Sequence, residues 1–374
     1  MKRIFAQNGA VVIRDVPEPV VGPAQVLVQT AFSVVSTGTE THIINATAET
    51  GETDDDQYPA EKPWGPQLRT HGIRWDGPAP LRRPPGLSSL GYSLSGTVLA
   101  VGSRVADLKP GDAVACSGSQ CAVHAERVSV PRNLVVRVPQ GVRLDEAAFV
   151  TVGSVSLHSL RRAGCELGET VVVMGLGLIG LLVVQMARVA GMYTLGLDPE
   201  PSRLILAREL GCDRVLDPRT GDPLTVIREM TDGFGADAVL LTAKTDSSEP
   251  LNLAFEMCRQ RATVVGVGLF GMNINRRSMF ERDVKLVASV AYGPGRYDPV
   301  YEEGGVDYPI GHARWTENRN MSAFLRLLSK KTVAVSNLVP ERFAFSEASA
   351  AYERLLRSEP RPATVLFAYG SAKV

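Results

Sequence analysis

The stretch from Thr170 to Asp198 limits the possible folds of this chain more than any other part of it. It begins with a run of apolar residues, Val171 to Met174, which passes directly into the glycine pattern Gly175-Leu-Gly177-Leu-Ile-Gly180. An apolar helical pattern and a second apolar run follow, and Asp198 stands about 20 residues after the glycines, as in the dinucleotide-binding fingerprint. A buried strand, a turn, a helix and a second strand in this order predict a βαβ unit that binds a dinucleotide.

Each part of the turn has a task in binding a pyrophosphate. Gly175 allows the tight turn, Gly177 lets the backbone approach the phosphates, and Gly180 lets the helix pack close to the strand. Leu178 and Ile179 begin the helix, whose first amides attract an anion. A glycine turn without a ligand is the alternative, but the surrounding order of elements favours the cofactor.

The acidic residue at the end of the second strand indicates which cofactor is bound. A carboxylate at Asp198 accepts hydrogen bonds from both ribose hydroxyls and repels a 2′-phosphate, so we expect NAD(H) rather than NADP(H). Arg203 is expected to lie over the adenosine. We also assign Thr242 and Gly266, which stand near the ends of two later predicted strands, to the cofactor site.

The composition gives no reason to expect a nucleic acid or a membrane as partner. The chain has 40 basic and 40 acidic residues and a formal net charge of zero, and a binding surface for polyanions needs a basic excess. No apolar run reaches the ~18 residues that a membrane span needs. Five scattered cysteines are too few for a disulfide framework. We therefore expect a cytoplasmic protein.

Short strand patterns separated by turns fill the first 145 residues and predict a small β-barrel-like unit. They are Val11–Arg14, Gln25–Val35, Val98–Val101, Ala113–Cys116, Glu126–Val130 and Leu134–Val138. Residues 47–89 interrupt them with many prolines and glycines, which predicts a long loop.

From Leu144 the pattern becomes helical and then alternates between strands and helices. The strands are Val171–Met174, Tyr193–Leu197, Arg214–Leu216, Ala236–Thr242, Arg261–Val267 and Lys285–Val290. Helical patterns include Leu144–Ala163, Pro201–Leu210, Leu251–Arg259 and Met321–Ser329, and Ala363–Tyr369 is a last strand. We predict an α/β fold in which a doubly wound Rossmann domain, residues 146–290, is inserted into a catalytic domain of residues 1–145 and 291–374.

This arrangement resembles the medium-chain dehydrogenase/reductase superfamily, in which a GroES-like β-barrel catalytic domain carries an inserted Rossmann domain. The zinc alcohol dehydrogenases of that superfamily contain Cys-Gly-Thr-Asp-x-His, and the corresponding residues here are Thr37-Gly-Thr39-Glu40-Thr41-His42. The zinc-binding Cys has become Thr37, and the His of the family's Gly-His-Glu motif has become Tyr92. The third ligand would lie within 151–156, which holds no Cys or Glu. The resemblance therefore implies that no metal is bound.

A closer resemblance is to a zinc-less branch, which is similar to the N-terminal half of bi-domain oxidoreductases. The motifs that carry it are Ser36-Thr-Gly-Thr-Glu40, Leu90-Gly-Tyr-Ser-Leu-Ser-Gly96, Tyr292-Gly-Pro-Gly-Arg-Tyr-Asp-Pro299, Tyr308-Pro and Arg314-Trp-Thr-Glu-Asn-Arg-Asn-Met321. The superfamily also implies a homodimer.

Without zinc, hydrogen-bond donors near the cofactor must stabilise the developing alkoxide. The catalytic candidates are Thr39, Glu40, Tyr92 and His42. Glu40 is expected to act either as a base, directly or through Thr39, or as a supporting carboxylate that binds an arginine or backbone amides. His42 either relays a proton or fills space.

Five residues are expected to line the substrate site. They are Thr37, Tyr292, Arg296, Tyr308 and Trp315. Ordinary loop packing is the alternative for each of the last four.

Together these observations predict a zinc-independent, NAD(H)-dependent alcohol dehydrogenase or ketoreductase that acts on a polyol, sugar or cyclitol-like small molecule in a biosynthetic pathway. Two alternatives stay open. One is an NAD(P)H-dependent enoyl or quinone reductase, against which Asp198 counts, and the other is a non-catalytic nucleotide-binding protein.

Overall fold

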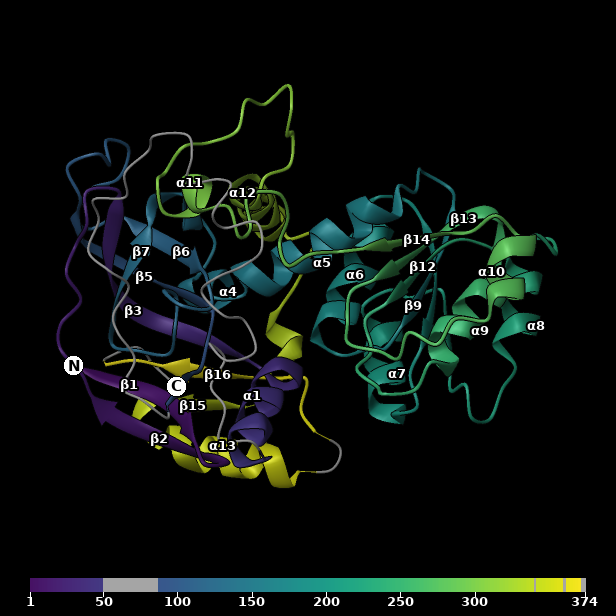
Figure 1. The fold of residues 1–374 in the computed structure, drawn as a ribbon, viewed down its shortest axis with the longest axis horizontal. Coiled ribbons are helices and arrows are strands. Elements are labelled where there is room, and N and C mark those ends of the chain that lie inside the picture. Colours follow the sequence, from purple (N-terminus) through teal and green to yellow (C-terminus); the bar gives the residue numbers. More distant parts are fainter. Residues whose placement is uncertain (50–86, 340, 359–360, 371–374) are drawn as a thin grey trace. The chain divides into compact units, whose positions relative to one another are not determined.

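The computed structural model describes residues 1–49, 87–339, 341–358 and 361–370. The chain divides into two compact units (Figure 1). Unit 1 contains Met1–Thr151, Pro294–Ser329 and Val335–Val374, and unit 2 contains Val152–Gly293 and Lys330–Ala334. These limits differ from the predicted domain limits by a few residues at each end and move a short segment after Ser329 into unit 2.

Unit 2 is built on a six-stranded parallel sheet with the order β11-β10-β9-β12-β13-β14. Its strands are β9 (Thr170–Met174), β10 (Tyr193–Leu197), β11 (Arg214–Leu216), β12 (Ala236–Leu241), β13 (Cys258–Gly266) and β14 (Lys285–Ala288). Its helices are α5 (Val150–Ala163, which begins in unit 1), α6 (Leu178–Val189), α7 (Pro201–Glu209), α8 (Pro223–Met230), α9 (Glu249–Met257) and α10 (Arg276–Glu281). The order places β9, which precedes the glycine turn, in the middle of the sheet and confirms the predicted doubly wound fold.

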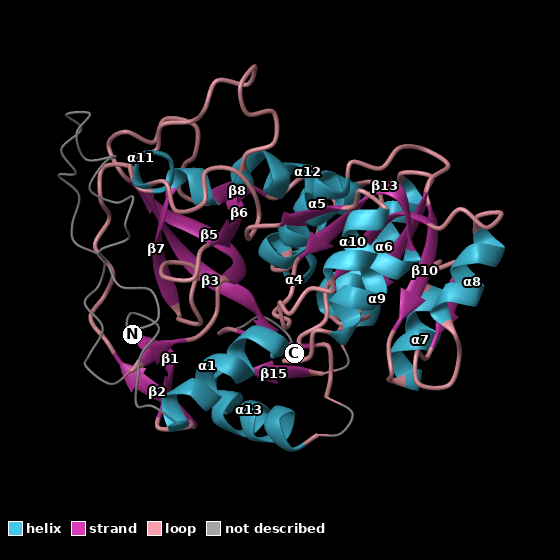
Figure 2. Ribbon diagram, turned by 45° about the vertical axis from the view of Figure 1, so that its right-hand side comes forward, coloured by secondary structure: helices cyan, strands magenta, loops and turns pink. Residues whose placement is uncertain are grey.

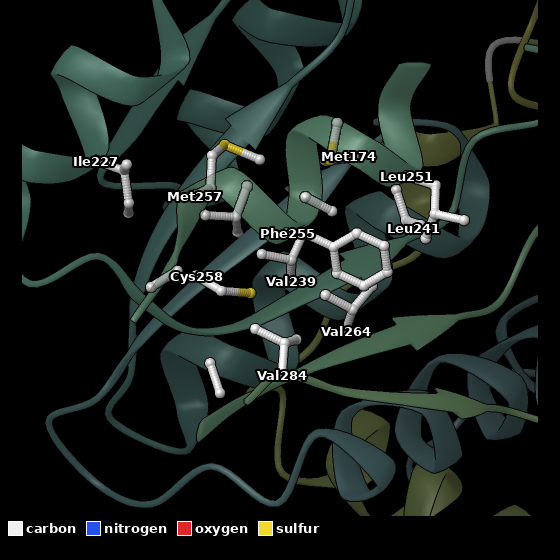
Figure 3. Packing of buried hydrophobic residues seen from close by; sticks show 14 of the residues in the cluster. Met174, Ile227, Val239, Leu241, Leu251, Phe255, Met257, Cys258, Val264 and Val284 are labelled. Carbon is white, nitrogen blue, oxygen red and sulfur yellow. The ribbon is translucent and has the colours of Figure 1, made fainter. Parts of the chain in front are cut away.

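The central strands β9, β10 and β12 are apolar and mostly buried because helices cover the sheet. All five residues of β9 are buried, as expected for a central strand of a parallel sheet. One core cluster joins Val172 and Leu197 to side chains from α9 and the later strands. Figure 3 shows Phe255 and Leu251 of α9 among Val239, Leu241 and Val264.

Unit 1 holds two antiparallel-rich sheets. One is the three-stranded sheet β2-β1-β4, and the other has the order β15-β16-β3-β5-β6-β8, with β7 also paired to β3. The strands are β1 (Lys2–Gln7), β2 (Ala10–Asp15), β3 (Gln25–Ser36), β4 (Ser88–Ser89), β5 (Ser93–Val101), β6 (Ala113–Ser117), β7 (Arg127–Pro131), β8 (Val135–Arg137), β15 (Arg342–Ala344) and β16 (Thr364–Ala368). The long strand β3 pairs with three partners and organises the unit.

The helices of unit 1 come from distant parts of the chain. They are α1 (Thr37–Glu49), α4 (Leu144–Ala147), α11 (Pro299–Glu302), α12 (Glu317–Ser329) and α13 (Ala348–Arg357). Helices α1 and α13 lie side by side (Figures 1 and 2), and Ile44 of α1 shares a core cluster with Ala348 and Ala351 of α13.

Several predicted elements need correction. The single helix predicted over 144–163 is two helices, α4 and α5, and the helix predicted over 251–259 ends at Met257 because Cys258 already begins β13. Strand β1 and helices α1 and α13 were not predicted. Helix α1 has the sequence TGTETHIINATAE, which is rich in β-branched residues of modest helix propensity, so its packing against other elements stabilises it. Most of the loop predicted over 47–89 lies outside the described residues.

Within the described parts of the chain, no helix is long and apolar enough to cross a membrane.

Candidate active site

The glycine turn of unit 2 has the geometry that the fingerprint requires. Gly175 has a φ of +100°, and a Cβ on it would lie 2.6 Å from the amide nitrogen of Ala243. A Cβ on Gly180 would lie 2.0 Å from the carbonyl oxygen of Gly175. A Cβ on Gly177, in contrast, would meet nothing within 4 Å. Two glycines therefore allow the turn to close, and the third keeps one side of the turn open in front of α6.

Asp198 and Thr242 hold this turn in place. The carboxylate of Asp198 accepts hydrogen bonds from the amides of Leu176 at 2.7 Å and Glu200 at 2.9 Å, one on each oxygen. The guanidinium of Arg203 lies 3.6 Å from the same carboxylate. The hydroxyl of Thr242 donates to the carbonyl oxygen of Gly175 at 2.6 Å. The carboxylate of Asp198 is thus oriented by two backbone amides, one from the glycine turn and one from the residues that follow β10.

The remaining cofactor candidates lie on the same edge of the unit 2 sheet. Leu178 and Ile179 form the start of α6, where the first amides of a helix lack intrahelical partners. Gly266 ends β13, and a Cβ on it would lie 2.8 Å from the ring of Phe270. Each candidate therefore stands at the carboxyl end of the sheet, where ligands bind in open α/β folds.

In unit 1, the catalytic candidates at the start of α1 differ in their solvent exposure. Glu40 is fully buried, whereas Thr39 and His42 are exposed. Thr37 is buried, and its hydroxyl donates to the carbonyl oxygens of Pro362 at 2.9 Å and Ala363 at 3.2 Å. The Thr37 hydroxyl is therefore tied to the segment that precedes β16.

The carboxylate of Glu40 is the centre of a buried hydrogen-bond network. Its Oε1 accepts from the amide of Ser36 at 2.9 Å. Its Oε2 lies 3.1 Å from Nε2 of His124 and accepts a short hydrogen bond from the hydroxyl of Tyr352. The neighbourhood of α1 and α13 (Figure 2) explains how a residue of α13 reaches this carboxylate. Three donors, two of them from distant segments, thus surround one buried carboxylate.

The network continues on the other side of the imidazole. Nδ1 of His124 lies 2.7 Å from the hydroxyl of Ser33, which lies 2.8 Å from the hydroxyl of Tyr369. The ring of His124 packs edge-on against Phe367, with 5.3 Å between ring centroids. His124 is completely buried, so apolar rings and hydrogen bonds together fix the orientation of its imidazole.

Tyr92 directly precedes β5 in the chain, and its hydroxyl faces the hydroxyls of Ser36 and Thr39. Burial raises the pKa of Tyr92 to about 12, the hydrogen bond with Ser36 acts in the opposite direction, and the charge of Glu40 raises it further. The phenol is therefore protonated at neutral pH and available as a donor.

Two of the expected substrate residues, Arg296 and Tyr308, are held by side-chain hydrogen bonds within unit 1. Arg296 donates to Glu302 at 2.6 Å and to Ser119 at 3.2 Å. The hydroxyl of Tyr308 donates to Asp298 at 2.5 Å. These contacts belong to unit 1.

The other two expected substrate residues have different settings. Tyr292 is buried and falls within unit 2. Trp315 is half-buried under the guanidinium of Arg314, whose Cζ lies 3.9 Å from the ring centroid. The structure does not bring Tyr292 together with Arg296 and Tyr308 in one compact unit.

Sequence reasoning missed His124, Tyr352 and Tyr369. They come from a loop, from a helix that was not predicted, and from the residue after β16. No fixed spacing connects them to Glu40, because the contacts span 84 residues for His124 and 312 for Tyr352. The contacts of His124 therefore become evident only from the tertiary structure.

The position of the superfamily's catalytic zinc does not fit a zinc ion in this structure. The hydroxyl of Thr37 donates to backbone carbonyls, and Tyr92 offers a protonated phenol in place of an imidazole. No three His, Cys, Asp or Glu side chains are grouped to hold a metal within the residues described.

Comparison with known proteins identifies the class of enzyme. Residues 179–303 match the family of zinc-binding dehydrogenases. The chain is 23% identical to D-arabitol-phosphate dehydrogenase of Enterococcus avium over 300 residues, 71% of this chain and 78% of that protein. It is 26% identical to (R,R)-butanediol dehydrogenase of Neisseria gonorrhoeae over 335 residues, 81% of this chain and 88% of that protein.

The fold is shared over the whole chain. A protein of Sinorhizobium meliloti 1021 solved with bound NADP superimposes with a TM-score of 0.72 at 20% identity, covering 98% of each chain. With the GroES-like sheets of unit 1 and the Rossmann sheet of unit 2, these similarities agree on one conclusion. The chain has the fold of medium-chain dehydrogenases and reductases, it is similar in sequence to several dehydrogenases, and it is an oxidoreductase.

Proposed function

We propose that this enzyme is a zinc-independent, NAD(H)-dependent dehydrogenase or ketoreductase whose substrate is a polyol, sugar or cyclitol-like small molecule. The observation that carries the proposal is Tyr92. The resemblance to the superfamily implies that its position corresponds to that of a zinc-binding imidazole, and its protonated phenol lies beside the hydroxyls of Ser36 and Thr39. A donor in this place can stabilise a developing alkoxide, which is the task that zinc performs in related enzymes.

Unit 2 supplies the cofactor site. Bound NAD(H) accepts or delivers a hydride at its nicotinamide ring. The open face of Gly177 and the first amides of α6 suit the pyrophosphate. Each oxygen of Asp198 accepts one backbone amide and keeps a lone pair for a ribose hydroxyl. The charge of this carboxylate disfavours the 2′-phosphate of NADPH.

Unit 1 supplies the proton chemistry. In the direction of reduction, the Tyr92 hydroxyl donates its proton to the carbonyl oxygen of the substrate, and in oxidation the same oxygen receives it. Thr39 is exposed and faces Tyr92, so its hydroxyl passes the proton between the phenol and water. His42 stands one turn further along α1 and is also exposed, where it can take the proton to solvent.

Glu40 has a supporting role in this proposal. Because its carboxylate is buried and accepts three hydrogen bonds, it suits the second of the two roles expected for it. Its charge favours the protonated form of Tyr92.

The substrate class is inferred from the relatives. D-Arabitol phosphate and butanediol both carry neighbouring hydroxyl groups, and the named relatives are dehydrogenases of such compounds. We place Arg296, Tyr308, Trp315, Tyr292 and Thr37 at the substrate site as part of this proposal. Arg296 is paired with Glu302, so we expect it to act by orienting the segment.

We also propose a homodimer that works in the cytoplasm. The balanced charge of the chain supports a soluble protein, and the dimer follows from the superfamily. Size-exclusion chromatography with light scattering measures the mass directly, and a monomer would contradict the proposal.

The first test combines metal analysis of the purified protein with NADH and NADPH titrations and a panel of polyols, sugars and ketones. We expect no stoichiometric zinc, tighter binding of NADH, and turnover that chelators do not abolish. Stoichiometric zinc or a preference for NADPH would contradict the corresponding part of the proposal. NADH binding without turnover of any compound would favour a non-catalytic protein.

The second test examines Tyr92 itself. Tyr92→Phe is expected to lower kcat by about 10²-fold to 10⁴-fold, the range for loss of a general acid–base group, while the Kd of NADH stays unchanged. Tyr193→Phe is the matched control, because Tyr193 is exposed at the start of β10. Equal kcat values for Tyr92→Phe and the wild type would remove Tyr92 from the mechanism.

A further inference from the structure

The residue before Tyr92, Gly91, packs against the imidazole of His124. Gly91 has a φ of +88°, and a Cβ on it would lie 2.7 Å from Cγ of His124 and 2.6 Å from its amide nitrogen. The amide of His124 donates to the carbonyl oxygen of Leu90 at 2.9 Å. Only glycine fits at such a contact with a positive φ. The backbone of Gly91, next to Tyr92, therefore packs directly against His124.

The other side of the same ring holds the segment that carries Thr39. Nε2 of His124 lies 3.1 Å from Oε2 of Glu40, and Glu40 stands next to Thr39 in the first turn of α1. Oε1 of Glu40 in turn accepts from the amide of Ser36. His124 thus contacts both segments that carry the hydroxyl groups of the proposed site.

The hydrogen bonds allow one consistent placement of protons with an ionised Glu40 and a neutral imidazole. A carboxylate can only accept, so Nε2 of His124 carries the proton that faces Glu40. Nδ1 then accepts from the Ser33 hydroxyl, which accepts from Tyr369. Every donor in this chain has an acceptor, and the buried charge has three donors, as buried polar networks require.

From this geometry we propose that His124 is a positioning residue for the Tyr92 and Thr39 hydroxyls, which it fixes relative to each other through Gly91 and Glu40. The inference rests on the proposed function, because that function gives Tyr92 its chemical task. His124 is completely buried and acts through these neighbours. The glycine motif of the cofactor site predicts neither the His124–Glu40 contact nor the packing of Gly91 against His124.

The test compares two substitutions at this position. His124→Leu removes both ring nitrogens, and His124→Gln keeps an amide donor at about the place of Nε2. We expect His124→Leu to lower kcat by about 10-fold to 100-fold, the usual effect of removing a supporting residue, with KM within about threefold. His124→Gln is expected to restore kcat to within about fivefold of the wild type, since it still donates to Glu40.

His158→Leu is the matched control. It removes another buried histidine, on α5 of unit 2, by the same substitution. We expect its kcat to match the wild type. Equal losses in His124→Leu and His158→Leu, no loss in His124→Leu, or no recovery in His124→Gln would each overturn the inference.

A measurement without turnover separates this inference from the proposed function. The protein has nine tyrosines, so it can be labelled with 3-fluorotyrosine, and the ¹⁹F resonance of Tyr92 is assigned by its loss in Tyr92→Phe. We expect this resonance to shift or broaden in His124→Leu and to stay unchanged in His158→Leu. If the wild type turns over no substrate but the resonance responds, the function fails and the positioning role stands. An unchanged resonance overturns the positioning role whatever the activity.

Tyr352→Phe replaces His124→Leu if that variant does not fold. It removes one of the three donors to Glu40 and keeps the ring that packs 5.7 Å from Phe367. A smaller drop in kcat at constant KM is expected, about threefold to tenfold, because only one of the three hydrogen bonds to Glu40 is lost. An unchanged kcat and an unchanged Tyr92 resonance in this variant would overturn the inference.

Discussion

The glycine turn of unit 2 and the network around Glu40 in unit 1 both place a buried carboxylate among hydrogen-bond donors, but they recruit those donors in different ways. Asp198 takes its donors from Leu176 and Glu200, 22 and 2 residues away. Glu40 takes two of its three from residues 84 and 312 positions away. The site of Asp198 forms within one βαβ unit. The site of Glu40 forms only when β3, α1, α13 and the loop of His124 have packed together.

The largest expected effect concerns the local site. Gly180→Ala puts a Cβ 2.0 Å from the carbonyl oxygen of Gly175, so the turn must move, and we expect NADH affinity to fall at least about 100-fold together with a loss of stability. Gly177→Ala meets no atom within 4 Å. This variant should keep the melting temperature and lose NADH affinity only. Isothermal titration and thermal melts measure both. Equal melting temperatures for the two variants would show that the turn adapts more easily than the structure indicates.

A double-mutant cycle sharpens the comparison between the two carboxylates. We expect Glu40→Gln and His124→Leu to show a coupling free energy of about 2–3 kcal/mol, because the pair is completely buried. The pair Asp198 and Arg203 is 3.6 Å apart with a partly exposed arginine, so its coupling should stay below about 0.5 kcal/mol.

Urea unfolding measures these couplings. Tryptophan fluorescence reports the first pair, since Trp315 lies in unit 1, and far-UV circular dichroism reports the second. Couplings of similar size would remove the distinction between the two sites.

The burial of His158 beside two arginines makes the folding stability depend on pH. Burial lowers the pKa of His158 to about 4, and the charges of Arg162 and Arg161 act in the same direction. The unfolded chain binds this proton near pH 6.5 and the folded protein only near pH 4, so folding stability falls as the pH drops through that window. The loss amounts to about 3 kcal/mol at 1.36 kcal/mol per unit.

His158→Gln should flatten the stability profile between pH 6.5 and pH 4. Urea unfolding at a series of pH values measures this. An unaltered slope in His158→Gln would mean that the imidazole is protonated inside the fold.

The smallest expected effect is on cofactor choice. Asp198→Asn keeps an acceptor for one of the two backbone amides and loses the charge. We expect NADH to bind about tenfold more weakly and NADPH more tightly, because one carboxylate–hydroxyl interaction is worth about 1.5 kcal/mol. Fluorescence titration with both nucleotides measures the ratio. A retained preference for NADH would show that other groups exclude the 2′-phosphate.

The comparison also explains which parts of the protein were predictable. The six strands of unit 2 followed from short apolar runs bounded by turns, because a strand buried on both faces must be apolar. Helix α1 was missed, because its polar and β-branched residues carry no strong helical pattern. Its place beside α13 in unit 1 depends on contacts between residues more than 300 positions apart.

Taken alone, the sequence determined the Rossmann unit, its central strand and the glycine turn, because strand, turn and acid interact over about 20 to 30 residues and each leaves a periodic or stereochemical trace. The tertiary structure decided that Glu40 is buried, that His124 and Tyr352 meet it, and that Gly91 makes room for the imidazole. Hydrogen bonds between distant segments leave no periodic trace in a sequence, since their geometry is defined only after the core has packed.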